Sequence, residues 1–101
     1  MDYQTKLQEL LQQIPEGKVT TYKEIAHAMN MRAYRFAGQL LHRNPHPEKY
    51  PCYKVVSSDG SLGGFALGQE EKIRRLKKDG IEVKDGRILD FKKKLYRFQT
   101  A

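Results

Sequence analysis

The stretch TYKEIAHAMNMRAYRFAGQLLH, residues 21–42, decides the fold that this sequence predicts. It opens with the spacing of a capping box, in which the Thr21 hydroxyl accepts a hydrogen bond from the amide of Glu24 and the Glu24 carboxylate bonds back to the amide of Thr21. A helix to about residue 29, a break of about three residues and a second helix over 32–42 follow from the apolar spacing. Two short helices joined this closely in a basic chain predict a helix-turn-helix, although many other helical hairpins share the pattern.

On either side of these helices, turn-forming residues divide the chain into short elements. Three prolines within residues 43–51 exclude a helix there and stiffen an extended path. The other predicted elements, in chain order, are a helix over 2–14 capped by Asp2, an extended segment at 19–20, a short strand over 52–56, a turn-rich loop over 57–64, a charged helix over 69–78 ended by Gly80, a hairpin of 81–83 with 87–89, and a last helical turn capped by Asp90. We therefore expect an α/β domain dominated by helices and winged-helix-like, with a short strand pair that carries Cys52.

Charge and cysteine content narrow the class of protein. The 101 residues hold 19 Lys and Arg against 12 Asp and Glu, a formal net charge of +7 that suggests a polyanionic partner. A single cysteine excludes an intramolecular disulfide and any cysteine-rich metal site, and the spacing of the histidines marks no metal site either. No apolar run approaches the ~18 residues of a membrane span, and no secretory signal is recognisable. We expect one cytoplasmic domain over residues 1–101, with the hairpin and the short helix in residues 81–101.

Cys52 is the candidate nucleophile, although a lone cysteine is more often a small buried hydrophobic residue. A proline-braced segment leads directly into it, and the glycine-rich loop over 57–64 follows, so the thiol could lie at the floor of a pocket. Cysteine chemistry requires the thiolate, which Lys54, helix amides or nearby arginines could stabilise. The basic side chains of the charged helix are expected to form a solvated face: Lys72, Arg74, Arg75, Lys77 and Lys78.

Five motifs, in chain order, carry a resemblance to a known family. They are Gly17-Lys18-Val19-Thr20-Thr21-Tyr22, Arg35 followed by Gly38, Asn44-Pro45-His46-Pro47, Pro51-Cys52-Tyr53-Lys54-Val55-Val56, and Ser58-Asp59-Gly60-Ser61-Leu62-Gly63-Gly64-Phe65. They resemble the helix-turn-helix entry, the arginine finger, the Asn-Pro-x-Pro hinge, the Pro-Cys-His-Arg-Val-Val signature and the following loop of the O6-alkylguanine-DNA alkyltransferases, or methylated-DNA–protein-cysteine methyltransferases. The resemblance spans roughly residues 5–80 and concerns only the C-terminal DNA-binding and catalytic domain of that family.

The resemblance implies a role for each matching residue. Cys52 would accept the alkyl group from guanine O6, once per protein molecule and without a cofactor or metal. Tyr22 would donate a hydrogen bond to guanine N3, and Arg35 would enter the base stack as the nucleotide rotates out. The other implied contacts are with DNA through Ala33, Tyr34, Gly38 and the hinge residue Asn44, and with the flipped base through Val55, Ser58 and Phe65. The implied partner is duplex DNA containing O6-alkylguanine, bound by a nucleoid-associated monomer.

Two departures from the family pattern touch the chemistry. Tyr53 stands where the family has a histidine that is water-linked to the cysteine, and Asp79 stands near the position of the glutamate that pairs with this histidine. Tyrosine, with an ordinary pKa of about 10, is a poor base near neutral pH. Cys52 would then be less ionised, or it would be activated by another group, such as a hydrogen bond from the Tyr53 hydroxyl or the charge of Lys54.

The departures keep two alternatives open. Alkyltransferase-like proteins share the fold and bind the lesion without transfer, but they lack the cysteine that this chain retains. A helix-turn-helix module with a structural cysteine would show no preference for the lesion. The family also includes fusions to endonuclease V, so the chain could be joined to a repair nuclease or cooperate with one.

Overall fold

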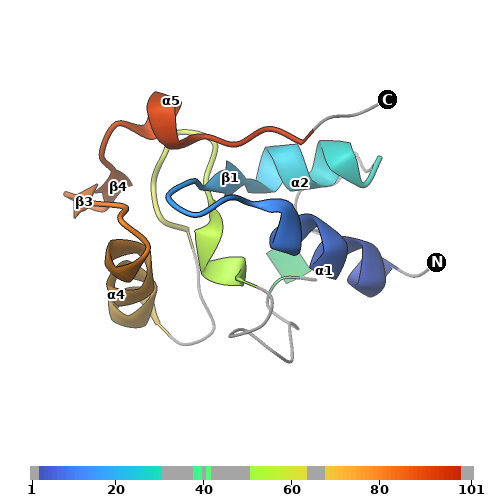
Figure 1. The fold of residues 1–101 in the computed structure, drawn as a ribbon, viewed down its shortest axis with the longest axis horizontal. Helices are drawn as coiled ribbons and strands as arrows, with labels where there is room; N and C mark the ends of the chain where they lie inside the picture. Colours follow the sequence, from blue (N-terminus) through green and yellow to red (C-terminus); the bar gives the residue numbers. More distant parts are fainter. Residues whose placement is uncertain (1–2, 31–37, 40, 42–50, 64–67, 99–101) are drawn as a thin grey trace.

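The computed structural model describes residues 3–30, 38–39, 41, 51–63 and 68–98. The elements are α1 (Tyr3–Gln13), β1 (Thr20–Thr21), α2 (Tyr22–Ala28), the 3-10 helix η1 (Cys52–Lys54), β2 (Val55–Val56), α4 (Gln69–Lys78), β3 (Val83–Lys84), β4 (Arg87–Ile88) and α5 (Phe91–Lys94). Figure 1 shows α1 and α2 at one end, α4 and the β3–β4 hairpin at the other, and residues 51–63 between them. The expected small, mostly helical fold with short strands is confirmed. None of the described helices is long and apolar enough to cross a membrane.

Of the two hydrogen bonds in the predicted capping box, the first is present at the start of α2. The Thr21 hydroxyl accepts a hydrogen bond from the Glu24 amide at 3.1 Å. The second half differs, because the Glu24 carboxylate lies 3.8 Å from the guanidinium of Arg97 near the end of the chain. The second helix of the predicted helix-turn-helix falls mostly outside the described residues, of which 38, 39 and 41 are helical.

Two hydrophobic cores lie on either side of a two-stranded parallel sheet. β1 pairs with β2 in the register Thr20 to Val55 and Thr21 to Val56. Because neighbouring side chains of a strand point to opposite faces, Val55 enters the first core and Val56 the second. The first core is Leu7, Leu10, Leu11, Ile14, Ile25, Ala26, Met29, Leu41, Cys52, Val55 and Phe98. The second core is Val19, Val56, Leu62, Leu76, Ile81 and Ile88.

The prediction of a strand over residues 52–56 was wrong in its first half. Cys52–Lys54 is a 3-10 turn, closed by hydrogen bonds from Lys54 N to Pro51 O at 3.1 Å and from Val55 N to Cys52 O. The tight turn follows Pro51, whose backbone φ is −74°, and it directs the Lys54 side chain toward buried partners. Cys52 therefore precedes the strand pair instead of being carried on it.

The C-terminal third contains the predicted helix and hairpin. α4 ends at Lys78 with Asp79 as its C-cap, and Gly80, with a φ of +83°, follows in the left-handed conformation expected after a helix. The hairpin turns at Asp85 and Gly86, whose φ values of +53° and +75° are those of a type I′ turn. Asp90 is the N-cap of α5, as predicted, and its carbonyl accepts hydrogen bonds from the Lys93 and Lys94 amides, whereas its side chain makes no capping hydrogen bond.

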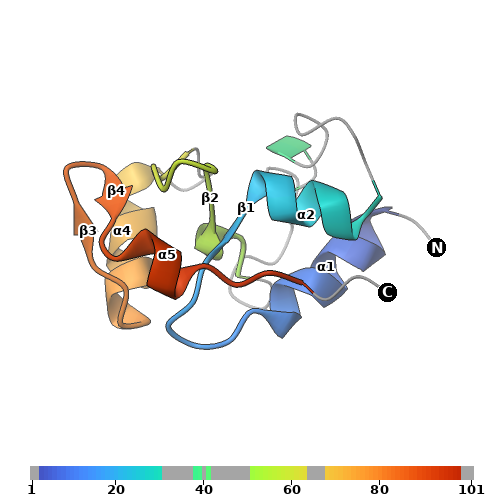
Figure 2. The same cartoon turned by 90° about the horizontal axis from the view of Figure 1, so that it is seen from above.

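After α5 the chain runs back across the molecule and joins β1. Val19 N donates to Lys94 O at 2.8 Å, and Tyr96 N donates to Val19 O at 2.7 Å. Figures 1 and 2 show this C-terminal stretch extending from the hairpin end toward α1 and α2. Phe98 is buried in the first core, where its ring meets that of Tyr96 edge-on at 5.2 Å.

Candidate active site

Cys52 occupies the first position of the 3-10 turn, between the two cores. Its side chain is 8% exposed and packs in the first core with the residues of α1 and α2. A buried thiol in apolar surroundings is ordinarily inert, because burial disfavours the thiolate. Whether Cys52 can react therefore depends on the charges that lie near it.

Lys72 supplies a positive charge close to this turn. The sequence predicted that Lys72 lies on a solvated face, and that prediction was wrong: the residue is 0% exposed. Its ammonium donates hydrogen bonds to Val55 O at 2.8 Å and to Leu62 O at 2.5 Å. One signal in the sequence could have indicated this, because Lys72 precedes the buried Leu76 by four residues and so shares its helix face.

The buried position of Lys72 lowers the pKa of its ammonium group. Burial lowers its pKa from 10.5 to about 8, and attraction to the negative charge of the Cys52 thiolate opposes part of that decrease. Near neutral pH the ammonium form therefore predominates. A thiolate at Cys52 would be attracted by this buried cation, whereas the family pattern led us to look for a base at Tyr53.

Asp79 influences Tyr53 through its charge, while its carboxylate is bonded to Lys54 and Gly17. The Asp79 carboxylate lies 2.9 Å from the Lys54 ammonium and accepts a hydrogen bond from the Gly17 amide at 3.0 Å. Lys54 also donates to Pro15 O at 3.0 Å, so its charge is held at the turn after α1. Burial, and then the charge of Asp79, raise the pKa of Tyr53 above its ordinary value of 10, so Tyr53 stays protonated at neutral pH and cannot serve as a base.

Tyr22 lies against the loop that follows β2. A Cβ atom placed on Gly63 would be 2.9 Å from the Tyr22 hydroxyl oxygen and 3.4 Å from the Ser57 hydroxyl oxygen. The first residue of α2 and the end of the loop over 57–63 are therefore in direct contact. Among the other predicted base contacts, Val55 is fully buried and Ser58 is exposed.

Most of the predicted DNA contacts cannot be placed. Gly38 is helical, and a Cβ atom added to it would meet nothing within 4 Å. The other predicted contacts lie outside the described residues: Ala33, Tyr34, Arg35, Asn44 and Phe65.

The contact between Tyr22 and Gly63 gives a testable prediction. Replacing Gly63 by alanine should lower the free energy of unfolding by about 2–4 kcal/mol, because its φ of +69° disfavours a side chain and the new methyl group would collide with the Tyr22 ring. Gly86→Ala is the matched control, since Gly86 has a φ of +75° and no atom within 4 Å of an added Cβ. Urea denaturation should show a clearly smaller loss for the control. Equal losses would mean that Tyr22 does not press on Gly63.

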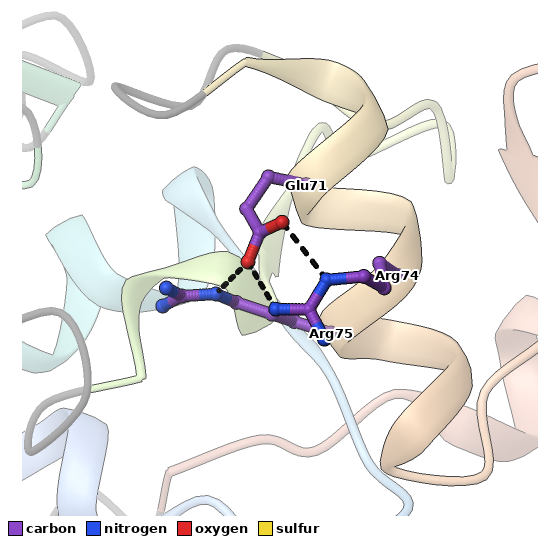
Figure 3. A network of polar contacts seen from close by, with 3 residues as sticks. All are labelled: Glu71, Arg74 and Arg75. Carbon is purple, nitrogen blue, oxygen red and sulfur yellow. Dashed lines mark hydrogen bonds and ion pairs between the residues drawn. The ribbon is translucent and has the colours of Figure 1, made fainter.

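The exposed side of α4 is partly neutralised within the helix. The Glu71 carboxylate binds the guanidinium groups of both Arg74 and Arg75, as Figure 3 shows. Hydrogen bonds from Arg74 and Arg75 lower the pKa of Glu71 to about 2. Two arginines of this helix are therefore engaged by a carboxylate, and the lysines at its end remain for other partners. Within the described residues, no group of three or more His, Cys, Asp or Glu side chains could hold a metal ion.

Comparisons with known proteins agree on one family. The family model described as "6-O-methylguanine DNA methyltransferase, DNA binding domain" matches residues 2–81. A bifunctional methyltransferase/endonuclease from Picrophilus torridus is 54% identical over 101 residues, which are 99% of this chain and 33% of that protein. Alkyltransferase-like protein 1 of Schizosaccharomyces pombe is 32% identical over 90% of this chain and 87% of its own length. The chain thus spans only a third of the bifunctional relative.

Solved structures give the same result. Atl1 of Schizosaccharomyces pombe, in complex with damaged DNA containing O6-carboxymethylguanine, has a TM-score of 0.81 at 29% identity, covering 94% of both chains. The O6-methylguanine-DNA methyltransferase of Pyrococcus kodakaraensis has a TM-score of 0.72 at 36% identity, covering 79% of this chain and 47% of that one. The chain belongs to the family of the DNA-binding domain of 6-O-methylguanine DNA methyltransferase.

Proposed function

We propose that the chain repairs DNA by transferring the alkyl group of O6-alkylguanine to Cys52, once per molecule. The observation that carries this proposal is the burial of both Cys52 and the ammonium of Lys72, which donates to the carbonyl of Val55 three residues after Cys52 and whose pKa is raised by a negative charge at Cys52. An ammonium buried without a functional reason is costly, because burial disfavours the charged form. A nucleophilic thiolate supplies such a reason, because the cation stabilises the negative charge that the sulfur must carry when it attacks.

The reaction needs no oxidant and no second substrate. The Cys52 sulfur attacks the alkyl carbon, a sulfur–carbon bond forms, and the bond from that carbon to guanine O6 breaks. The electrons of the broken bond leave with the guanine as an anion, which a hydrogen bond from the Tyr22 hydroxyl to N3 would stabilise before it takes up a proton. The product is a thioether, so the protein is consumed.

Cys52 can reach the alkyl group only after the alkylated base has left the duplex. We assign this step to Arg35, which would fill the stack while the lesion turns toward Cys52, and to residues 32–42, for which the sequence predicts a helix that would lie in the minor groove. The hinge at Asn44 and the wall at Phe65 belong to the same proposal. A formal net charge of +7 favours a polyanion, and relatives of this fold have been solved in complex with DNA. The working partner is therefore duplex DNA within the cell, bound by a monomer.

Intact mass spectrometry tests the transfer directly. Wild-type protein incubated with a duplex containing O6-methylguanine should gain one methylene group, located on Cys52 by peptide mapping. Cys52→Ala should bind the same duplex and keep its mass. An unchanged wild-type mass, despite binding that prefers the lesion, would reject the transferase proposal.

A second candidate function is lesion recognition without transfer. The similarity to Atl1 over 94% of both chains favours it, because that protein was solved bound to DNA that contains O6-carboxymethylguanine. The relationship to methyltransferase/endonuclease proteins makes a repair nuclease the natural cooperating partner. In the mass experiment this candidate predicts tight lesion-specific binding and no added methylene group.

A further inference from the structure

The C-terminal tail, residues 82–98, is attached to two places that flank the candidate active site. The family model matches residues 2–81, so the tail lies beyond the part of the chain that the model describes. In Figures 1 and 2 it begins at the β3–β4 hairpin, passes through α5 and ends beside β1 and α2. Different parts of the tail make the two attachments: residues 86–91 make the first, and residues 93–96 make the second.

The first attachment is to the loop over 57–63. Ile88 N donates to Gly60 O at 2.9 Å, and Leu62 N donates to Gly86 O at 3.2 Å. Ser61 also bridges to Arg87 in antiparallel fashion, so the loop acts as a further strand beside the hairpin.

A ring contact tightens this first attachment. A Cβ atom placed on Gly60 would lie 3.1 Å from Cγ of Phe91, so the Phe91 ring rests directly on the Gly60 backbone. Phe91 is the first residue of α5 and packs against the second core. The loop is thereby fixed between its own hydrogen bonds to the hairpin and one aromatic ring of the tail.

The second attachment is to β1, which leads directly into Tyr22. The Thr20 hydroxyl donates to Tyr96 O at 2.9 Å, and the Lys18 ammonium donates to Lys93 O at 2.7 Å. Together with the backbone hydrogen bonds at Val19, these contacts hold residues 93–96 alongside residues 18–20, where Val19 and Leu95 form an isolated parallel bridge. The position of Tyr22 is therefore set partly by the tail.

The geometry points to the tail as the element that fixes the spacing between Tyr22 and the loop over 57–63, with Phe91 as the positioning residue. This inference rests on the proposed function, in which Tyr22 contacts the flipped base, and on the expected contact of that base with Ser58 of the loop. Tyr22 and the loop touch at Gly63, so a relaxation of the loop would open room between them for a larger alkyl group. The tail would thus restrict which O6-alkyl groups the site accepts, in favour of small ones.

The test compares two tail phenylalanines. Phe91→Ala removes the ring that rests on the loop, whereas Phe98→Ala removes a buried ring of the same tail from the first core. Each variant is checked for folding by circular dichroism and assayed at a temperature where both are native. The assays are single-turnover transfer from duplexes containing O6-methylguanine or O6-benzylguanine, and the dissociation constants of both duplexes.

We expect Phe91→Ala to raise the benzyl-to-methyl rate ratio about tenfold, while Phe98→Ala changes it less than about twofold. Phe91→Leu, which keeps an apolar side chain over Gly60, should restore a ratio near that of the wild type. An equal change in both alanine variants, or an unchanged ratio in folded Phe91→Ala, would overturn the inference. If the wild type transfers neither group, the proposed function fails, and the ratio of dissociation constants decides the inference by the same comparison.

Discussion

Replacing Lys72 by methionine should slow alkyl transfer at pH 7 by about 10²-fold or more, while affinity for the lesion-containing duplex is retained. The reason is that the Lys72 ammonium is a buried positive charge that, in our proposal, stabilises the Cys52 thiolate, and Tyr53 cannot take a proton from the thiol. Methionine has a similar length and no charge, so the packing around α4 is disturbed little. Single-turnover kinetics with the O6-methylguanine duplex measure the effect.

The charge of Lys72 can also be tested without an activity assay, through the pH dependence of the free energy of unfolding. The pKa of Lys72 is about 8 in the folded protein and 10.5 in the ordinary, exposed state. Between these values the unfolded chain binds more protons than the native one, so the free energy of unfolding should rise with pH, by about 2–3 kcal/mol from pH 8 to 10. Tyr53, with its raised pKa, opposes this trend only above pH 10.

Lys72→Met should abolish that rise in stability. A flat profile in the wild type would show that Lys72 is not titrating in the buried position. Transfer at the wild-type rate by Lys72→Met, with the stability profile changed as expected, would show that the ammonium is buried but does not assist the thiol. The two measurements therefore separate the location of the charge from its role.

Local sequence signals predicted most of the secondary structure, because each depends on residues that are close along the chain. The bounds of α4, the glycine after it and the hairpin turn at Asp85 and Gly86 were all confirmed. The Thr21 cap was also confirmed, since its geometry needs only the amide three residues later. Cys52 and Tyr22 were assigned to the candidate site on a different basis. The motifs that contain them resemble those of the family and follow one another in the same order.

Contacts between distant residues were not predictable in this way. Lys54 reaches Pro15, and Asp79 reaches Gly17, across 39 and 62 positions of the sequence. The tail joins β1 across 75 or more positions. Charged residues are ordinarily exposed, so Lys72 was placed on the surface, and only its helical phase relative to Leu76 argued otherwise. The place where the tail docks could not be predicted, because backbone hydrogen bonds and contacts of Phe91 and Phe98 with residues far away in the sequence hold it there.

Replacing Asp79 by alanine should lower the free energy of unfolding by about 3–5 kcal/mol, the largest loss of stability that we expect from one substitution. The Lys54 and Asp79 side chains are 6% and 13% exposed, and removing the carboxylate would leave the Lys54 ammonium buried with only a carbonyl partner at Pro15. The Gly17 amide would lose its acceptor as well. Glu82→Ala, at an exposed position a few residues away, should change stability by no more than about 0.5 kcal/mol.

The double variant Lys54→Met with Asp79→Leu separates structure from catalysis at this pair. Because both charges are removed together, stability should recover to within about 1–2 kcal/mol of the wild type. If the pair only holds the 3-10 turn against the end of α4, the refolded double variant should transfer the methyl group at nearly the wild-type rate. If Asp79 instead acts in the chemistry through Tyr53, or if the Lys54 charge activates the thiol, the double variant will be stable and inactive. Measuring both quantities on this one protein decides whether the Lys54–Asp79 pair belongs to the reaction or to the scaffold that holds Cys52 in place.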